Sequence, residues 1–160
     1  TRLRDLVFDM RGWSRSLKSL PGVACFAGME ALPACLSEAD ILICLLPLTD
    51  ETRGILNARV FAHLKRGASL IHAARGAHLV EADLLQALSD GRLAHAVIDV
   101  FATEPLPPEH PFWKHPAITV TPHVAAITRP GTGAEDIVEN YRRAMRGQPL
   151  INQVDRAQGY

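Results

Sequence analysis

Short apolar runs alternate with amphipathic segments along the whole chain. The runs have the length and the β-branched content of buried strands, and they cover residues 7–13, 23–27, 41–46, 69–74, 93–100 and 118–123. The amphipathic segments place apolar residues on one face, and they predict helices over 29–37, 58–64, 80–88 and 133–146. Strands alternating with helices favour the α/β class, a parallel sheet with flanking helices.

Three polar side chains follow these runs at the points where strands would end. Arg75 closes SLIHAARG, Glu104 follows LAHAVIDVFATE, and His123 ends ITVTPH. Ligands of open parallel sheets bind at the carboxyl ends of the strands. We therefore expect Arg75, Glu104 and His123 to converge on one crevice.

This set of side chains suits the reduction of a keto acid. Arginine presents a planar fork of donors that can bind a carboxylate bidentately, and it stays charged at any working pH. Histidine gives or takes a proton near neutrality, and a neighbouring glutamate stabilises its imidazolium form and fixes its tautomer. No side chain supplies a hydride, so a cofactor has to provide it.

The segments around these residues resemble the signature regions of the D-isomer-specific 2-hydroxyacid dehydrogenases. They are HAARG at 72–76, IDVFATEPLP at 98–107 and TPHVAAIT at 121–128. GWSRSLKSLPGV at 12–23 and QVDRAQGY at 153–160 are similar to the glyoxylate/hydroxypyruvate reductase branch of that family. The match covers nearly the whole chain, in consistent order.

The resemblance implies a Rossmann-type NAD(P)-binding fold in a homodimeric enzyme. It implies that Arg75 binds the carboxylate and carbonyl of the substrate. It further implies that His123 is the general acid/base and that Glu104 is its partner. One position departs from the pattern, because His72 stands where the family often has asparagine.

The residues after the first predicted strand bear on the choice of cofactor. An acidic residue at this strand end binds the ribose hydroxyls of NAD, whereas an arginine accommodates the 2′-phosphate of NADP. No carboxylate stands there, and Ser14, Arg15 and Lys18 form a small basic pocket. We therefore expect NADPH, with NADH as the alternative. A solvated basic turn would have the same sequence.

Further residues are candidates for cofactor contacts. The resemblance places Leu46, Pro47 and Thr52 on the adenosine and ribose side, although Pro47 would also end a strand because it lacks a backbone donor. Asp99 lies in an apolar run, where a carboxylate needs hydrogen bonds, and by resemblance it accepts one from the nicotinamide amide. Small residues that could let the nicotinamide lie close, or could simply pack tightly, are Ala73, Ala74, Ala125 and Ala126.

The start of the sequence lacks a feature of dinucleotide-binding folds. Such folds begin with a strand and a GxGxxG turn that brings the pyrophosphate onto a helix N-terminus. The eleven glycines form no such cluster, and TRLRDL reads as the end of a helix. We interpret residues 1–147 as a Rossmann domain truncated at its first strand and Gly-rich loop. Residues 148–160 are then a tail that, in the family, returns to a substrate domain.

Composition excludes several other classes. Forty-eight per cent hydrophobic and 21% charged residues are ordinary for a globular protein, and 17 basic against 17 acidic residues give no net field to attract nucleic acid or a membrane surface. No apolar run approaches the ~20 residues of a membrane span. The spacings of cysteine and histidine suggest neither a redox pair nor a metal site. An odd number of thiols fits the cytoplasm.

These observations predict that the parent protein reduces glyoxylate or hydroxypyruvate with NADPH, with His123 as proton donor. Two alternatives stay open. A non-catalytic dinucleotide-binding or regulatory module could use the same scaffold. The 160-residue chain could also be an inactive fragment of the reductase.

Overall fold

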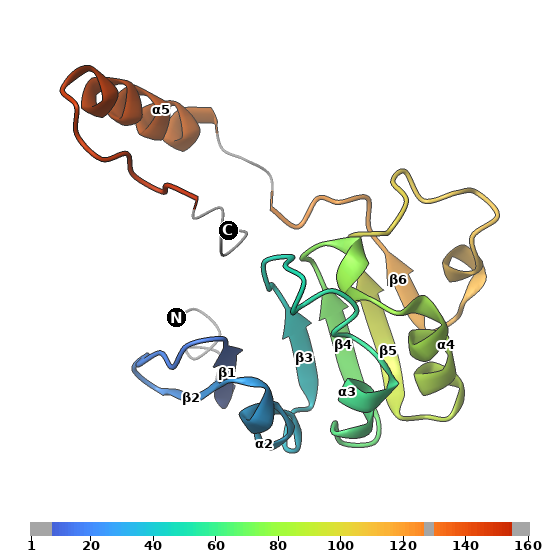
Figure 1. Cartoon of the computed structure of the whole chain (residues 1–160). Coiled ribbons are helices and arrows are strands. Elements are labelled where there is room, and N and C mark those ends of the chain that lie inside the picture. The colour runs from blue at the N-terminus through green and yellow to red at the C-terminus, as the bar shows by residue number, and fades with distance from the viewer. Residues whose placement is uncertain (1–7, 127–129, 155–160) are drawn as a thin grey trace.

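The computed structural model describes residues 8–126 and 130–154. Strands and helices alternate along these residues (Figure 1). The strands are β1 Met10–Ser14, β2 Val23–Ala27, β3 Ile41–Cys44, β4 Ala68–His72, β5 Leu93–Ile98 and β6 Ile118–Val120. The α-helices are α2 Leu32–Leu36, α3 Ala58–Ala62, α4 Glu81–Ser89 and α5 Pro130–Met145, and the 3₁₀ helices are η1 Met29–Ala31, η2 Gly76–His78 and η3 Pro111–Lys114.

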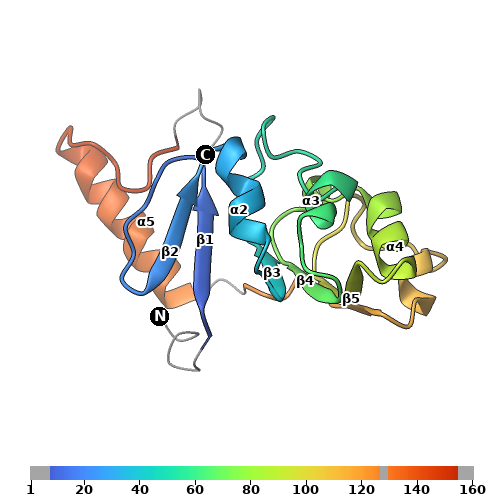
Figure 2. The same cartoon turned by 90° about the horizontal axis from the view of Figure 1, so that it is seen from below.

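All strand pairs are parallel, as the sequence predicts. β1 pairs with β2, and a four-stranded sheet has the order β3-β4-β5-β6. The arrowheads of the four-stranded sheet point to one edge, and α3 and α4 cover one face (Figure 1). Figure 2 shows α2 between the β1–β2 pair and this sheet. The predicted α/β architecture with flanking helices is confirmed, and its strand ends share an edge.

One strand differs from expectation. The apolar run 41–46 predicts a central strand covered on both faces, but β3 is an edge of the four-stranded sheet. Ile41 and Ile43 are 45% and 41% exposed, whereas Cys44 is buried. An apolar run indicates a tendency toward burial, but it does not encode the strand order that decides which neighbours cover it.

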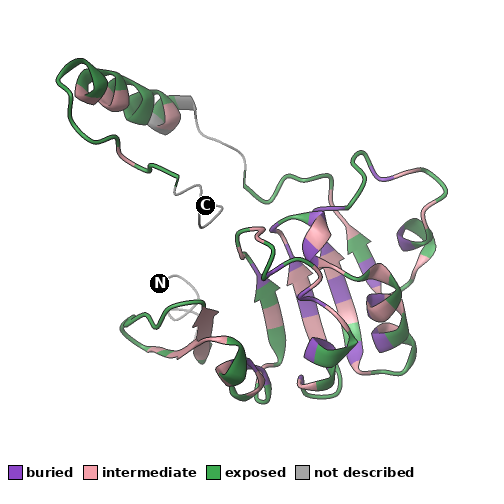
Figure 3. Ribbon diagram, in the orientation of Figure 1, coloured by how far each residue is buried: buried purple, intermediate pink, exposed green. Residues whose placement is uncertain are grey.

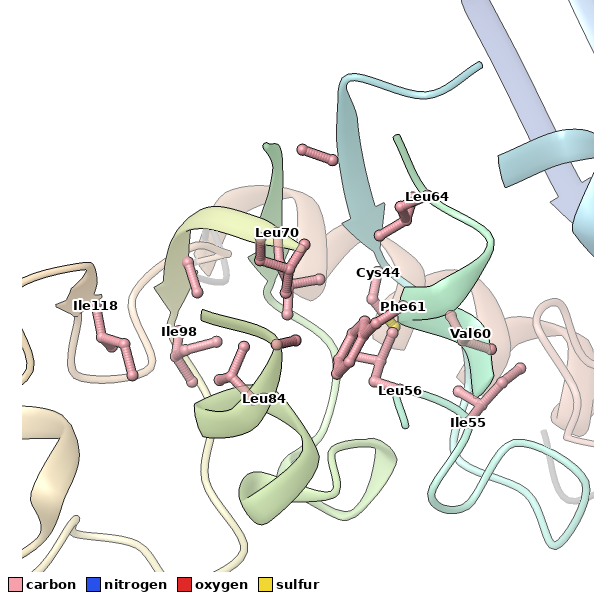
Figure 4. Close-up of a cluster of buried hydrophobic side chains, with 14 of the residues drawn as sticks. Cys44, Ile55, Leu56, Val60, Phe61, Leu64, Leu70, Leu84, Ile98 and Ile118 are labelled. Atoms are coloured by element: carbon pink, nitrogen blue, oxygen red, sulfur yellow. The ribbon is translucent and has the colours of Figure 1, made fainter. Parts of the chain in front are cut away.

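The hydrophobic core lies between the four-stranded sheet and its two helices. Phe61 of α3 and Leu84 of α4 pack against the sheet residues Leu70 and Ile98 (Figure 4). Burial alternates along β4, so one face of this strand is covered and the other is partly open (Figure 3). Each fully buried side chain of this size contributes about 1.5–3 kcal/mol to folding. The core therefore fixes the strands whose ends carry the polar residues.

Local signals set the boundaries of α3. Asparagine is favoured at helix N-caps, and the side chain of Asn57, directly before the helix, accepts a hydrogen bond from the Val60 amide at 3.1 Å. Gly67, which follows the helix, has a φ of 78° that favours glycine. The helix ends at Ala62, two residues before the predicted end, which is within the ordinary uncertainty of helix boundaries.

The proline-rich segment 105–116 predicts a stiff loop without helix, and this is wrong in part. Pro111–Lys114 forms η3, since proline is compatible with the first turn of a helix. Phe112 is fully buried and anchors the loop. Trp113 is exposed, and its indole N–H donates to the Pro107 carbonyl.

Helix α5 lies apart from the four-stranded sheet (Figure 1). The apolar residues predicted to form one stripe, Ile137, Val138, Tyr141 and Met145, are exposed. The beginning of the tail folds back along α5, because the Asn140 side chain bonds both the N–H and the carbonyl of Ile151. Tail residues 155–160 lie outside the described residues. No helix within the described ranges has the length and apolar character needed to cross a membrane.

Candidate active site

Two of the three strand-end residues are in direct contact. His123 Nδ1 lies 2.8 Å from Glu104 Oε2. The other carboxylate oxygen of Glu104 accepts the Phe101 amide at 2.9 Å. The hydrogen bonds from His123 and from Phe101 lower the pKa of Glu104, which keeps its carboxylate ionised at neutral pH. Because a carboxylate only accepts, Nδ1 of His123 donates, and Nε2 is the atom left to exchange a proton with a ligand.

Arg75 follows β4 at the same edge of the sheet. Its Nη1 donates to the Ala74 carbonyl at 2.7 Å, which leaves other donors of the guanidinium for a ligand. After the hydrogen bonds from His123 and Phe101, the positive charge of Arg75 further lowers the pKa of Glu104. The guanidinium is therefore within electrostatic range of the Glu104–His123 pair.

A close backbone contact brings these strand ends together. Gly76 directly follows Arg75, and a Cβ added to it would lie 1.9 Å from the Phe101 carbonyl carbon and 2.1 Å from its oxygen. Only glycine fits such an approach. The turn after β4 therefore packs directly against the turn after β5, which carries Glu104.

Asp99 organises the turn that carries His123. Its buried carboxylate, 4% exposed, accepts the Thr121 hydroxyl at 2.5 Å and the amides of Val124 and Ala125 at 2.9 and 3.0 Å. Burial would raise the pKa of Asp99, but these hydrogen bonds outweigh it and lower the pKa. His123 has a φ of 54°, which is uncommon for a residue with a side chain. The bonds to Asp99 hold the backbone on both sides of this residue. The expected contact of Asp99 with the nicotinamide stays a prediction.

An open cleft of about 680 Å³ extends from Arg75 along the ends of β3 and β4. Its wall contains Leu46, Pro47, Ala73 and Ala74, four of the residues expected to face the cofactor. The wall is mostly apolar, with a cation at one end, and this chemistry fits a nicotinamide ring beside a carboxylate-bearing substrate.

Thr52 is placed behind this cleft wall. Its side chain is buried, and its hydroxyl donates to the Pro47 carbonyl at 2.7 Å and accepts the Thr49 amide at 2.8 Å. Thr52 therefore shapes the turn that presents Pro47 to the cleft. Ala125 and Ala126 follow His123 and are exposed.

The residues predicted to form a basic pocket lie at and after the carboxyl end of β1. Ser14 is the last residue of the strand, and its hydroxyl donates to the Ser16 carbonyl at 2.7 Å. Arg15 and Lys18 are exposed in the loop that follows. Two cations and a hydroxyl at a strand end have the donor chemistry that a phosphate requires.

Other reactive side chains form no second centre in the described residues. The three cysteines are free, and burial raises the pKa of Cys35 and of Cys44, which makes these thiols unreactive. Within residues 8–126 and 130–154, no three side chains of histidine, cysteine, aspartate or glutamate are grouped so as to hold a metal ion.

Comparison with known proteins decides the family. Residues 1–125, which include Arg75, Glu104 and His123, match the sequence model of the D-isomer specific 2-hydroxyacid dehydrogenase, NAD binding domain. The chain belongs to this family. Glyoxylate/hydroxypyruvate reductase A of Serratia proteamaculans is 55% identical over 159 residues, which cover 99% of this chain and 51% of that protein. The chain thus spans about half the length of this curated relative.

Solved structures of family members have the same fold. The D-isomer specific 2-hydroxyacid dehydrogenase from Xanthobacter autotrophicus Py2, in complex with NADPH and MES, is 52% identical with a TM-score of 0.92, covering 96% of this chain and 63% of that one. The NADPH-dependent glyoxylate/hydroxypyruvate reductase from Sinorhizobium meliloti, in complex with NADP and sulfate, is 41% identical with a TM-score of 0.94, covering 99% and 52%. The Rossmann-type prediction is confirmed.

Sequence reasoning missed several residues that build this site. Thr121 binds Asp99, and His78 binds the backbone of Arg75. A signal for His78 was present, because His72 and His78 stand three residues before and after Arg75 in HAARGAH. The approach of Gly76 to Phe101 had no such signal, since it joins residues 25 positions apart.

The buried His72 leads to a first prediction, on acid stability. Burial and the nearby His78 lower the pKa of His72 to about 4, although its hydrogen bond to the Arg75 carbonyl opposes this. An unfolded chain takes up a proton near pH 6.5 that folded His72 does not, so stability falls as the pH drops from about 6.5 to about 4. This difference between the pKa of His72 in the unfolded and the folded chain corresponds to about 3 kcal/mol of the free energy of unfolding.

Unfolding midpoints of the full-length protein between pH 7 and pH 4.5 test this. The unfolding midpoint of the His72→Gln variant should vary less with pH than that of the protein without the substitution. Glu104 and Asp99, whose pKa values are lowered, begin to lose their stabilising effect as the pH falls to the ordinary carboxyl values of 4.5 and 3.8, at and below the lower end of this interval, and the loss is the same in variant and parent. Parallel curves for variant and parent would contradict the prediction.

Proposed function

We propose that the full-length protein reduces a small 2-keto acid, glyoxylate or hydroxypyruvate, to the 2-hydroxy acid with NADPH. The observation that carries this proposal is the contact between His123 and Glu104 beside Arg75, at neighbouring strand ends. Similarity to glyoxylate/hydroxypyruvate reductases supports the substrate class. Because this chain spans about half of the Serratia relative, the proposal concerns the whole protein.

Arg75 is proposed to bind and orient the keto acid. A guanidinium binds a carboxylate through two parallel hydrogen bonds, which fix both the position and the plane of a small planar acid. Arg75 lies at the edge of the cleft, close to the Glu104–His123 pair. A keto acid held there has its carbonyl oxygen turned toward His123.

His123 is proposed to protonate that carbonyl oxygen. Glu104 accepts a hydrogen bond from Nδ1–H, which directs Nε2 at the substrate and stabilises the imidazolium form before transfer. As negative charge builds on the carbonyl oxygen, Nε2 donates its proton and the imidazole becomes neutral. The bound NADPH supplies the hydride to the carbonyl carbon.

Other residues are proposed to hold NADPH. Ser14, Arg15 and Lys18 would bind the 2′-phosphate, since they follow β1 at its carboxyl end. Leu46 and Pro47, with Thr52 behind them, would face the adenosine and ribose. The nicotinamide would be flanked by the remaining candidates, Ala73, Ala74, Asp99, Ala125 and Ala126.

A second prediction separates NADPH from NADH. Arg15→Ala in the full-length protein should raise the KM for NADPH by about tenfold, because a charge-assisted contact to the phosphate is lost, and should leave kcat nearly unchanged. The KM for NADH should stay within about twofold, because NADH has no 2′-phosphate. Arg59→Ala, which removes another exposed arginine, is the matched control. An equal rise of the KM for NADPH and the KM for NADH would contradict the placement of Arg15 at the 2′-phosphate.

The proposed function itself is tested by NADPH oxidation with the full-length protein. Turnover with glyoxylate or hydroxypyruvate, and production of the 2-hydroxy acid, is the expected result. NADPH binding without turnover of either acid would favour the non-catalytic module instead. The homodimer and the cytoplasmic location expected from the sequence stay predictions.

A further inference from the structure

We propose that His72 and His78 are positioning residues that clamp the backbone of Arg75 and tie it to the Pro47 turn, which also lines the cleft. The inference depends on the proposed role of Arg75 in binding the keto acid. It concerns two buried histidines for which the reaction itself has no use.

The two histidines enclose Arg75 in sequence and in space. His72 is the last residue of β4, and His78 is the last residue of η2. Both are 0% exposed. Their rings meet edge to face, with centroids 5.8 Å apart and an interplanar angle of 86°. Burying two imidazoles without hydrogen bonds would be unfavourable, so the bonds that they make indicate their role.

Both rings contact backbone groups of Arg75. His72 Nε2 lies 3.0 Å from the Arg75 carbonyl oxygen, and since this oxygen only accepts, Nε2 carries the proton. His78 Nδ1 lies 2.9 Å from the same carbonyl oxygen and 3.3 Å from the Arg75 nitrogen, whose N–H it accepts when Nδ1 carries no proton. The amide and the carbonyl of Arg75 are therefore both held by imidazoles.

The second nitrogen of His78 reaches the Pro47 turn, another segment that lines the cleft. His78 Nε2 lies 3.2 Å from the Pro47 carbonyl oxygen and donates to it. With its proton on Nε2, His78 has Nδ1 as the acceptor for the Arg75 amide, and a proton on Nδ1 would be donated to the Arg75 carbonyl, so His78 binds the Arg75 backbone in either tautomer. Pro47 and Arg75 both line the cleft, so His78 joins two of its lining segments.

The remaining nitrogen of His72 argues against a role in packing alone. His72 Nδ1 is buried and has no hydrogen-bond partner in the described part of the chain. An unsatisfied buried nitrogen is unfavourable, and an apolar side chain of similar shape would avoid it. The bond from Nε2 to the Arg75 carbonyl is the feature of His72 that an apolar residue could not provide.

The clamp matters because the direction of a side chain follows from its backbone. Arg75 is exposed and its guanidinium bonds only the Ala74 carbonyl among the contacts of the described residues, so side-chain contacts fix it little. Misplacing a substrate-holding group by 1 Å can lower a rate by about 100-fold. Holding both backbone groups of Arg75 limits such displacement.

Variants of the full-length protein separate the two bonds. His72→Leu removes the donor to the Arg75 carbonyl, and His72→Gln keeps a donor at the same distance along the side chain. His78→Asn keeps an acceptor near the Nδ1 position and loses the link to Pro47. His95→Leu is the control, because His95 bonds a surface threonine, Thr119, away from the cleft.

We expect His72→Leu to raise the KM for the keto acid by about 10- to 100-fold, with the dissociation constant of NADPH, measured by fluorescence, within about twofold. His72→Gln should recover most of the loss. His78→Asn should have the opposite pattern: it should weaken NADPH binding about tenfold and change the keto acid KM less. The control should match the parent in every measurement.

Other results would overturn the inference. Lower unfolding midpoints with unchanged KM and NADPH affinity would leave both histidines a packing role only, as would failure of His72→Gln to restore what His72→Leu loses. If His72→Leu does not fold, His72→Gln and His78→Asn are compared with the unsubstituted protein. They still show whether the two positions affect the keto acid KM and the NADPH affinity differently.

If the full-length protein without substitutions turns over neither acid, the proposed function is rejected independently of the clamp. Amide hydrogen exchange at Arg75 then tests the clamp alone. Faster exchange of this amide in His78→Leu, but not in His78→Asn, is expected, and equal exchange in both variants would overturn the clamp.

Discussion

Replacing His123 with alanine in the full-length protein is expected to lower kcat by about 10²- to 10⁴-fold, the usual contribution of a general acid. The imidazole is the proton donor that Glu104 orients, and alanine leaves the developing oxyanion without a proton. The dissociation constant of NADPH should stay within about twofold, because the side chain acts on the substrate oxygen. Steady-state kinetics and fluorescence titration with NADPH measure the two effects.

The control for this substitution is His63→Ala, which removes a histidine at the end of α3. It should leave kcat unchanged. Glu104→Gln should lower kcat less than His123→Ala, since the amide still occupies the position beside Nδ1 but no longer stabilises the imidazolium. Equal losses of turnover and NADPH affinity in His123→Ala would contradict the assignment of His123 as proton donor.

Gly76→Ala is expected to disrupt the site through the backbone. The new Cβ would lie 1.9 Å from the Phe101 carbonyl carbon, so the turns after β4 and β5 have to separate. Overpacking against backbone atoms should destabilise the protein by about 3 kcal/mol. The separation also moves Arg75 away from Glu104, and kcat/KM should fall by about 100-fold.

Thermal unfolding and steady-state kinetics of the full-length protein measure these effects. A loss of this size lowers the midpoint by about 6–12 °C. Gly131→Ala is the matched control, because a Cβ at Gly131 in α5 meets nothing within 4 Å, and alanine is the better helix former. A Gly76→Ala protein with the midpoint and activity of the parent would show that the two turns need not touch.

The sequence predicted the position of the site because the rule involved is local. Arg75, Glu104 and His123 each follow an apolar run, and parallel strands end at one edge of the sheet. The contact between Glu104 and His123 follows from adjacent strands, β5 and β6, that pair in register. The N-cap at Asn57 and the positive φ of Gly67 are likewise local features, since asparagine is favoured at helix starts and glycine at positive φ.

What the sequence could not show depends on neighbours distant along the chain. The smallness of Gly76 serves a contact with the Phe101 backbone, which no local pattern indicates. Asp99 was expected at the nicotinamide, and its carboxylate holds the turn around His123. The edge position of β3 depends on strand order. In each case residue type indicated importance, but the partner came only from the tertiary structure.

In the proposed enzyme a guanidinium, a carboxylate and an imidazole meet around one keto acid. A crystal structure of the full-length protein with NADP and oxalate, an unreactive planar dicarboxylate, tests this arrangement most directly. We expect one oxalate whose carboxylate is bound by the Arg75 guanidinium, with an oxygen within hydrogen-bond distance of His123 Nε2 and with Glu104 still hydrogen-bonded to Nδ1. Oxalate bound away from Arg75, or with His123 turned out of its reach, would contradict it.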